Sequence, residues 1–357
     1  MFLQNGFRNA LLDSPIEILR ALDCDLVGIS VARFSLPIEQ AFAKSLFDRA
    51  IADGDVSDAT PVYICSGESQ VHVPGEPLRP IRVIGIDPAG HWFVDQRIDL
   101  QLEKLTTTFT ALLDSRSRSK YGFELPKLDA IQKQSIELAD QPIEIVGLVE
   151  IGTDFANDGS MIVSERTFGK LFPSRTLDSR LSQVDLALFR VRDGANHPQV
   201  AGRLTKMNDR LWVVMPRDQL MAREVQFWNQ QTPVGAIFFI GSIVGFAVGL
   251  IICYQILFNI INDSLPEFAT LKAIGYENRY FVTLVIKQAT YLSILGFVPA
   301  VITSWFLFDG IEWIIGLPMH LTLSRVSFVF ALTVGMCLIS GVIALRKLFT
   351  ADPASLF

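Results

Sequence analysis

Charge is scarce in this chain. Only 19% of its 357 residues are charged, against about 25% in ordinary soluble domains, and 50% are hydrophobic. Its 31 Lys and Arg are outnumbered by 37 Asp and Glu, which gives a net charge of −6. This balance excludes nucleic acid as the main partner, because binding to phosphate requires a basic surface. The shortage of charge indicates instead that part of the chain lies in lipid.

Motifs of catalysis and metal binding are missing as well. The sequence holds no HExxH, no GxSxG and no Walker A motif. It has four histidines and four widely separated cysteines: His72, His91, His197, His320, Cys24, Cys65, Cys253 and Cys337. We therefore expect no catalytic residue, no metal and no cofactor, and any ATP hydrolysis must come from a separate protein. A pair between Cys24 and Cys65 stays open if their domain is exported.

The hydrophobic residues gather in three charge-free runs, at 233–261, 288–308 and 326–345. Each reaches the roughly 20 residues that span a hydrocarbon core. Buried helices of a soluble protein are the alternative, but three such runs close together favour membrane spans. Residues 226–357 are therefore predicted to form a helical membrane domain.

Residues 13–225 look different, because charges recur every few positions and Pro and Gly punctuate short apolar stretches. Strands are predicted at 59–65, 80–86, 142–151, 160–165 and 184–191 from their β-branched content and turn boundaries. Helices are predicted at 37–52 and 164–171. The expectation is a mixed α/β domain that is large enough to bury its own core.

Lys and Arg near the spans predict the orientation. Three lie in the loop after the first span, at Lys272, Arg279 and Lys287, and Arg346 and Lys347 follow the third. The remaining loop has only one basic residue, so the first loop and the C-terminus are predicted to be cytoplasmic. This places the α/β domain outside, across the membrane from the cytoplasm. The opposite orientation is the alternative.

A domain of this size needs an upstream segment to carry it across, and the sequence shows no signal peptide. Residues 1–12 read instead as the exit end of a membrane helix. We therefore expect a fourth span that precedes Met1. The predicted fold class is an α-helical membrane bundle, with three spans present and an N-terminal one missing, plus a mixed α/β extracytoplasmic domain.

The first run carries Gly241, Gly245 and Gly249, four residues apart. Glycines at this spacing line one helix face and let another backbone approach closely, within a subunit or between subunits. None of the three runs contains Asp, Glu, Lys or Arg, where coupled transporters usually place ionisable groups. The energy for any transport is therefore expected to come from a partner.

The loop after the first span predicts a short helix over 265–274. Ser264 and Glu267 have the spacing of a capping box, and Gly275 is placed to end the helix in a left-handed conformation. At about ten residues the helix is too short to span, and its apolar stripe favours an amphipathic helix in the membrane plane with one face open to a partner. An ordinary connecting helix is the alternative.

The stretch PEFATLKAIGYENRYF (266–281) resembles the cytoplasmic coupling-helix region of FtsX/MacB-type ABC transporter permeases. Residues 346–354 resemble that family's C-terminus. Within the family, the segments 1–15, 25–30, 83–88 and 153–159 look most like those of the DevC-like permeases of cyanobacteria. The similarity runs over essentially the whole chain.

This resemblance implies four spans, a homodimer with a second permease copy and a separate ABC ATPase subunit. DevC-like members also imply a membrane-fusion protein and an outer-membrane channel, that is, a tripartite exporter for a lipid or glycolipid-like cargo. By residue, Glu267, Phe268, Leu271, Lys272 and Gly275 fall on the coupling segment and are expected to serve ATPase docking. Two alternatives stay open: a non-transporting transmembrane signal transmitter of the FtsX type, and an inactive truncated permease remnant.

Overall fold

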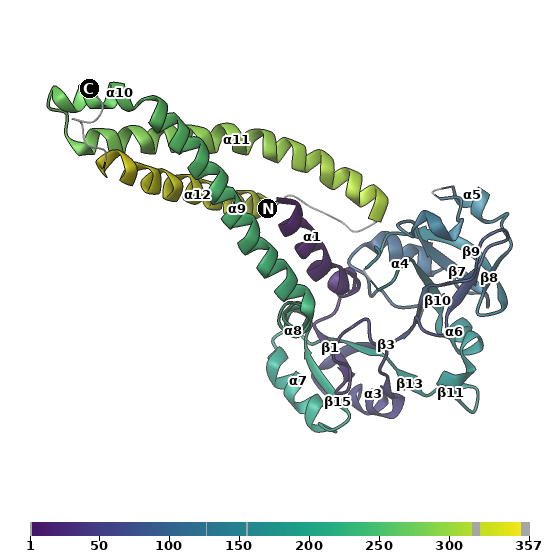
Figure 1. Ribbon diagram of the computed structural model, residues 1–357. Coiled ribbons are helices and arrows are strands. Elements are labelled where there is room, and N and C mark those ends of the chain that lie inside the picture. The colour runs from purple at the N-terminus through teal and green to yellow at the C-terminus, as the bar shows by residue number, and fades with distance from the viewer. Residues whose placement is uncertain (1, 126, 155, 316–321, 351–357) are drawn as a thin grey trace. The chain divides into compact units, whose positions relative to one another are not determined.

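The computed structural model describes residues 2–125, 127–154, 156–315 and 322–350. The chain divides into two compact units (Figure 1). The sheet unit comprises Leu11–Gln231, and the helical unit comprises Met1–Ala10 with Thr232–Phe357. Each is described by itself.

The sheet unit is built on an eleven-stranded mixed sheet. In spatial order the strands are β15 (Trp212–Pro216), β1 (Leu26–Ser30), β14 (Leu186–Val191), β3 (Val56–Cys65), β6 (Arg82–Ile86), β10 (Ser160–Ser164), β7 (Thr110–Asp114), β9 (Gln141–Val149), β8 (Ile136–Leu138), β4 (Gln70–His72) and β5 (Arg79–Pro80). The pairs β6–β10 and β7–β9 are parallel, and the other pairs are antiparallel. Two short ribbons pair β2 (Phe42–Ala43) with β13 (Gln183–Val184) and β11 (Thr176–Leu177) with β12 (Arg180–Leu181).

Helices cover both faces of this sheet, because alternate side chains of its strands point to opposite sides. On β3, Tyr63 and Cys65 belong to one hydrophobic cluster, whereas Val62 and Ile64 belong to the other. The first cluster is covered by α3 (Lys44–Ala50), α5 (Leu128–Ile131), α6 (Glu165–Leu171) and α7 (His197–Lys206). The second is covered by α2 (Glu17–Ala21), α4 (Gln96–Leu102) and α8 (Arg217–Gln230). Three 3₁₀ turns complete the unit, η1 (Ser14–Ile16), η2 (Ser119–Tyr121) and η3 (Pro173–Arg175).

One close approach in this layer requires a glycine. A Cβ on Gly85, in β6, would lie 2.8 Å from three side-chain carbons of Phe168 in α6. The helix itself begins as the sequence predicts, because the Ser164 hydroxyl accepts the Thr167 N–H at 3.3 Å as an N-cap. Glycine on the strand therefore lets α6 pack directly on the sheet.

All five predicted strands are confirmed, with ends shifted by a few residues. The predicted helix 37–52 is wrong in its first half, since only Lys44–Ala50 is helical. The residues before this helix form hydrogen bonds with other segments instead. Phe42 and Ala43 pair with β13, and the Glu39 carboxylate accepts the N–H groups of Ser66 and Gly67. Tertiary hydrogen bonds thus override the helical periodicity.

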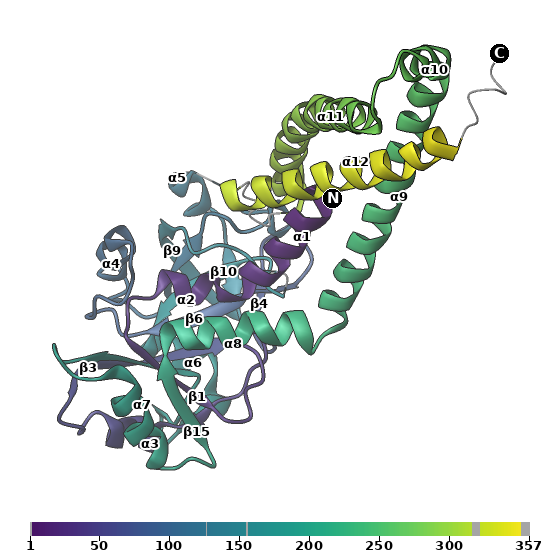
Figure 2. The same ribbon diagram turned by 90° about the vertical axis from the view of Figure 1, so that its left-hand side faces the viewer.

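Among the described residues of the helical unit, three helices are long and apolar enough to cross a membrane: α9 (Pro233–Asp263), α11 (Asn278–Ile315) and α12 (Leu323–Thr350). α12 lies against both α9 and α11 (Figures 1 and 2). α11 starts ten residues before the predicted run 288–308. The run was limited to residues without charge, whereas the helix also includes Arg279 and Lys287. Charged residues therefore limit the apolar run, but they do not mark the ends of the helix.

The N-terminal helix α1 (Phe2–Asp13) places its first residues in the helical unit. The Gln4 amide donates a hydrogen bond to the Phe238 carbonyl at 3.3 Å. A Cβ on Gly6 would lie 2.2 Å from the ring of Phe308, so this contact also depends on glycine. Residues 2–10 thus pack against α9 and α11, and the fourth span before Met1 stays a prediction.

Candidate functional site

The predicted short helix is present as α10 (Leu265–Ala273), between α9 and α11. Its predicted capping box is wrong, because the Ser264 side chain makes no cap hydrogen bond. Ser264 directly follows α9 with φ −93° and ψ 5°, outside the extended region in which an N-cap hydroxyl reaches the next turn. The chain thus turns from one helix into the next through backbone bonds alone, such as Phe268 N–H to the Ser264 carbonyl at 3.0 Å.

The end of α10 follows the prediction. Gly275 has φ +104°, a conformation that side chains disfavour. The Gly275 N–H donates to the Lys272 carbonyl and the Tyr276 N–H to the Leu271 carbonyl, both at 3.1 Å. This pair of backbone hydrogen bonds is the Schellman motif, which fixes the direction in which the chain leaves the helix.

The five residues predicted for docking divide between two sides of α10. Phe268 is only 5% exposed and meets the Phe281 ring edge-on at 5.5 Å, and Leu271 packs on the same cluster. Glu267, Lys272 and Gly275 are exposed. Phe268 is therefore a poor candidate for direct contact with an ATPase, because its ring is buried against Phe281 and packs α10 on α11.

Sequence reasoning overlooked the apolar tip beyond the helix. Ile274 is 71% exposed, and Tyr276 and Tyr280 are exposed with their rings 4.8 Å apart. Ile274 is the last apolar residue of the predicted stripe, and in the structure its side chain is exposed at the turn that ends α10. Exposed charge on Glu267 and Lys272 beside this tip makes a mixed surface of the kind that protein interfaces use.

The glycines of α9 lie against neighbours within the chain. A Cβ on Gly241 would come 2.0 Å from the Gln4 amide of α1, and one on Gly249 would come 2.8 Å from Met336 Sδ of α12. Side chains of α1 and α12 thus occupy the space that a Cβ would take at these two glycines of α9. The predicted packing role of Gly245, within the subunit or between subunits, stays a prediction.

Two cysteines meet between α9 and α12, which the sequence did not indicate. Cys253 Sγ and Cys337 Sγ are 3.6 Å apart, although 84 positions separate them in the chain. Cys24 and Cys65, by contrast, lie in clusters on opposite faces of the sheet, so the pair left open by the sequence does not form. Burial raises the pKa of the Cys24 thiol to about 12 and that of Cys65 to about 11, which keeps both inert.

We expect iodine to join Cys253 and Cys337 in the native protein in membranes. Each thiol loses its hydrogen and the sulfurs close to about 2.05 Å, while iodine is reduced to iodide. Alkylation after denaturation, followed by mass spectrometry, should then find Cys24 and Cys65 modified and the other two linked. Cys253→Ser is the control that abolishes the link. Four alkylated cysteines in oxidised wild type would contradict the contact.

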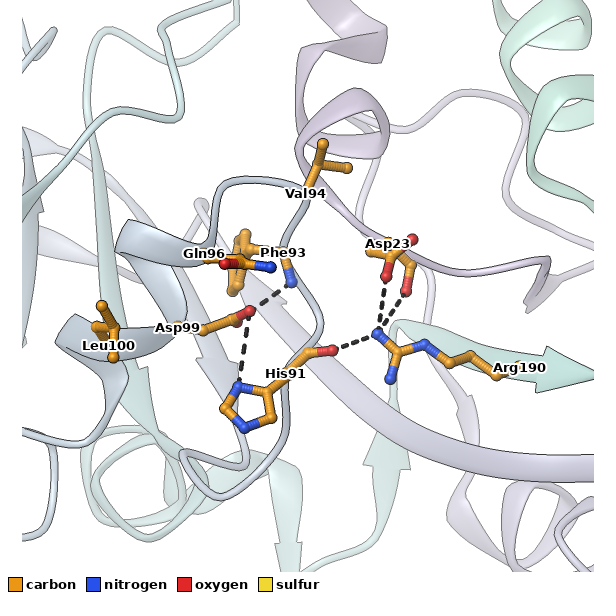
Figure 3. A pocket seen from close by; sticks show the side chains of 8 residues that line it. All are labelled: Asp23, His91, Phe93, Val94, Gln96, Asp99, Leu100 and Arg190. Carbon is orange, nitrogen blue, oxygen red and sulfur yellow. Dashed lines mark hydrogen bonds and ion pairs between the residues drawn. The ribbon is translucent and has the colours of Figure 1, made fainter.

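A hollow of about 490 Å³ opens on the sheet unit (Figure 3). It is lined by Asp23, His91, Phe93, Val94, Gln96, Asp99, Leu100 and Arg190. Asp99 accepts the N–H groups of Trp92 and Phe93 at 3.2 and 3.3 Å and lies 3.8 Å from His91 Nδ1. Burial raises the pKa of the Asp99 carboxyl, and these N–H groups oppose the rise.

Arg190 occupies the other wall of this hollow. It pairs with Asp23 at 2.9 Å, donates to the His91 carbonyl, and stacks over the Trp92 ring at 4.5 Å. The charged groups thus satisfy one another, and we assign the hollow no catalytic role. Among the described residues, no group of three or more His, Cys, Asp or Glu side chains could hold a metal ion.

Phe93 and the tryptophans of the sheet unit offer little surface for contact with a partner. Trp92, Trp212 and Phe93 are at most 4% exposed, so they serve the core. Trp228 is half-buried and donates its ring N–H to the Glu224 carboxylate at 2.8 Å.

Most of the helical unit matches the model of a known protein family. Residues 236–353, about a third of the chain, match the family model described as FtsX-like permease C-terminal. This region, with its three apolar helices and the short α10 between the first two, is thus similar to an FtsX-like permease domain.

The sheet unit is similar to solved domains at low identity. One is the periplasmic region of MacB from Actinobacillus actinomycetemcomitans, with 13% identity and a TM-score of 0.37 over 58% of this chain and 95% of that one. Another is the extracellular domain of the noncanonic ABC-type transporter YknZ from Gram-positive bacteria, with 13% identity and a TM-score of 0.34 over 54% and 98%. Neither likeness is close enough to define what the sheet unit does.

Proposed function

We propose that this chain is the permease subunit of an ATP-driven ABC exporter. The observation that carries the proposal is the match of residues 236–353 to an FtsX-like permease domain, in which α10 joins two candidate spans and presents an exposed tip. A separate ATPase subunit would bind at α10 on the cytoplasmic side. The first span contains no Asp, Glu, Lys or Arg from Val234 to Asn262, which supports an energy source outside the membrane.

The finer parts of the proposal extend the family resemblance. The chain would act as a homodimer in the inner membrane, with the sheet unit in the periplasm. A membrane-fusion protein and an outer-membrane channel would complete a DevC-like tripartite assembly. A lipid or glycolipid-like molecule would be its cargo.

Charge reversal on α10 tests the docking role. We expect Glu267→Arg combined with Lys272→Glu to lower co-purification of the ABC ATPase by about tenfold, because both side chains are exposed and a misplaced charge pair costs of the order of 1.4 kcal/mol. The measurement is the ratio of ATPase to tagged chain after solubilisation of native membranes, with the ATP turnover of the complex.

The matched control is Glu103→Arg, an exposed charge reversal in the sheet unit. Phe268→Ala is a second comparison: it should loosen α10 from Phe281 and reduce both docking and thermal stability. Equal ATPase recovery from the α10 reversal and the Glu103 control would refute docking at α10.

A further inference from the structure

The helix α8 leads from the sheet unit into α9, with only Gln231 and Thr232 between them. It has fourteen residues, of which two, Leu220 and Glu224, are buried. Its first turn is fixed, because the Arg217 N–H donates to the Asp25 carbonyl at 3.0 Å. The buried side chain of its second half is thus a carboxylate, that of Glu224.

Glu224 is 2% exposed and gathers donors from two segments. Its carboxylate accepts the Ser35 hydroxyl, the Leu36 N–H at 3.1 Å and, from its own helix, the Trp228 ring N–H at 2.8 Å. All three donors are neutral. A buried carboxylate is tolerated only when such bonds replace its water, so losing them leaves buried groups unpaired on both sides.

The partner segment is the loop of residues 31–39, called here the clamp loop. It has no regular secondary structure, yet its own polar groups tie it to the sheet. Arg33, 1% exposed, donates to the Asp185 carbonyl at 3.0 Å and to the Leu36 carbonyl at 2.9 Å. At the far end the Glu39 carboxylate accepts the Gly67 N–H at 2.8 Å. The clamp loop thus connects α8 with the ends of β3 and β14.

A second bond reinforces the same contact. Arg223, the neighbour of Glu224, donates to the Arg33 carbonyl at 3.0 Å. Two adjacent residues of α8 therefore hold two neighbouring stretches of the clamp loop. Hydrogen bonds are directional, so they resist sliding and rotation of a helix better than apolar contact of the same area.

We infer that Glu224 is a positioning residue that makes α8 and the clamp loop move as one body, and so passes displacement of the first span to the sheet unit. The inference rests on the proposed function, because it assumes that a nucleotide-driven change reaches α9. Without Glu224, α9 would still move, but the second half of α8 would slide along the clamp loop and the sheet would not follow.

Hydrogen–deuterium exchange of the complex with its ATPase, with and without ATP and vanadate, tests this. In wild type we expect nucleotide to change exchange at α10 and also at residues 33–38. In Glu224→Met the response at α10 should remain, the response at 33–38 should vanish, and the Leu36 amide should exchange about tenfold faster. Glu224→Gln should behave as wild type, because its amide oxygen still accepts the same N–H groups.

Two further variants serve as a control on the same helix and as a milder change to the same contact. Asp218→Ala changes an exposed carboxylate on the same helix and should leave every response intact. Ser35→Ala removes one donor and should weaken the response at 33–38 partially; this variant decides the matter if Glu224→Met unfolds the sheet unit.

A full nucleotide response at 33–38 in Glu224→Met, together with faster Leu36 exchange, would overturn the inference. A wild type that responds to nucleotide at α10 but not at 33–38 would overturn it also. No response at either place would instead refute the proposed function, and with it any coupling role for Glu224.

Discussion

Arg82→Met is expected to lower the free energy of unfolding by about 3–5 kcal/mol, enough to unfold a marginal domain. Arg82 is 5% exposed in β6 and pairs with Asp154 at 2.5 Å. It also donates to the Ser160 hydroxyl at 2.8 Å and the Gly152 carbonyl at 3.3 Å. Methionine keeps much of the volume but leaves the Asp154 carboxylate buried without its cation.

The measurement is denaturant unfolding of the purified chain, followed by the fluorescence of the buried Trp92 and Trp212. Arg97→Met is the control, because its pair with Asp95 is exposed, and we expect it to leave stability nearly unchanged. The double variant Arg82→Met with Asp154→Leu should lose less than the two single losses added, since it leaves no buried charge. Equal losses from Arg82→Met and Arg97→Met would contradict the burial of this pair.

On the proposed docking role of α10, Gly275→Val should lower recovery of an ABC ATPase on this chain by about tenfold while leaving the three candidate spans folded. A β-branched residue at φ +104° costs about 1–3 kcal/mol, which breaks the Schellman motif and frees the end of α10. Ile274 and Tyr276 would then no longer be held outward together. The readouts are ATPase recovery on the tagged chain and amide exchange across 265–276.

Gly275→Asn is the graded comparison, because asparagine adopts positive φ more readily than other side chains. We expect the order Gly, Asn, Val in both ATPase recovery and protection of the Tyr276 amide. If valine and asparagine gave the same protection, the conformation at this position would not limit the end of α10.

Sequence alone predicts the features that depend on neighbours along the chain. The three apolar runs and the end of α10 at Gly275 are local patterns, and both have the expected structure. Strands β1 and β7 were not predicted. Like β6 and β10 they are five residues long and buried on both faces, so they show no alternation, and β7 has only one β-branched residue, Thr110.

The contacts that sequence could not supply join distant positions. Ser35 and Glu224 are 189 positions apart, and Cys253 and Cys337 are 84 apart. Nothing in the local sequence marks Glu224 as buried, since it lies on a helix with mostly polar neighbours. Phe268 shows the converse: its motif resembles a docking segment, but only packing reveals that the ring faces inward.

The order of strands has a consequence for how this domain can vary. Leu26, the first residue of β1, pairs with Pro216, the last of β15, so the chain enters and leaves the sheet about 5 Å apart. The middle of the chain supplies β9, β8, β4 and β5 at the opposite edge. Evolution can therefore lengthen, shorten or replace that far edge while the two attachment points stay unchanged. We therefore expect homologues to differ in length most at the edge formed by β9, β8, β4 and β5, and least at β1 and β15.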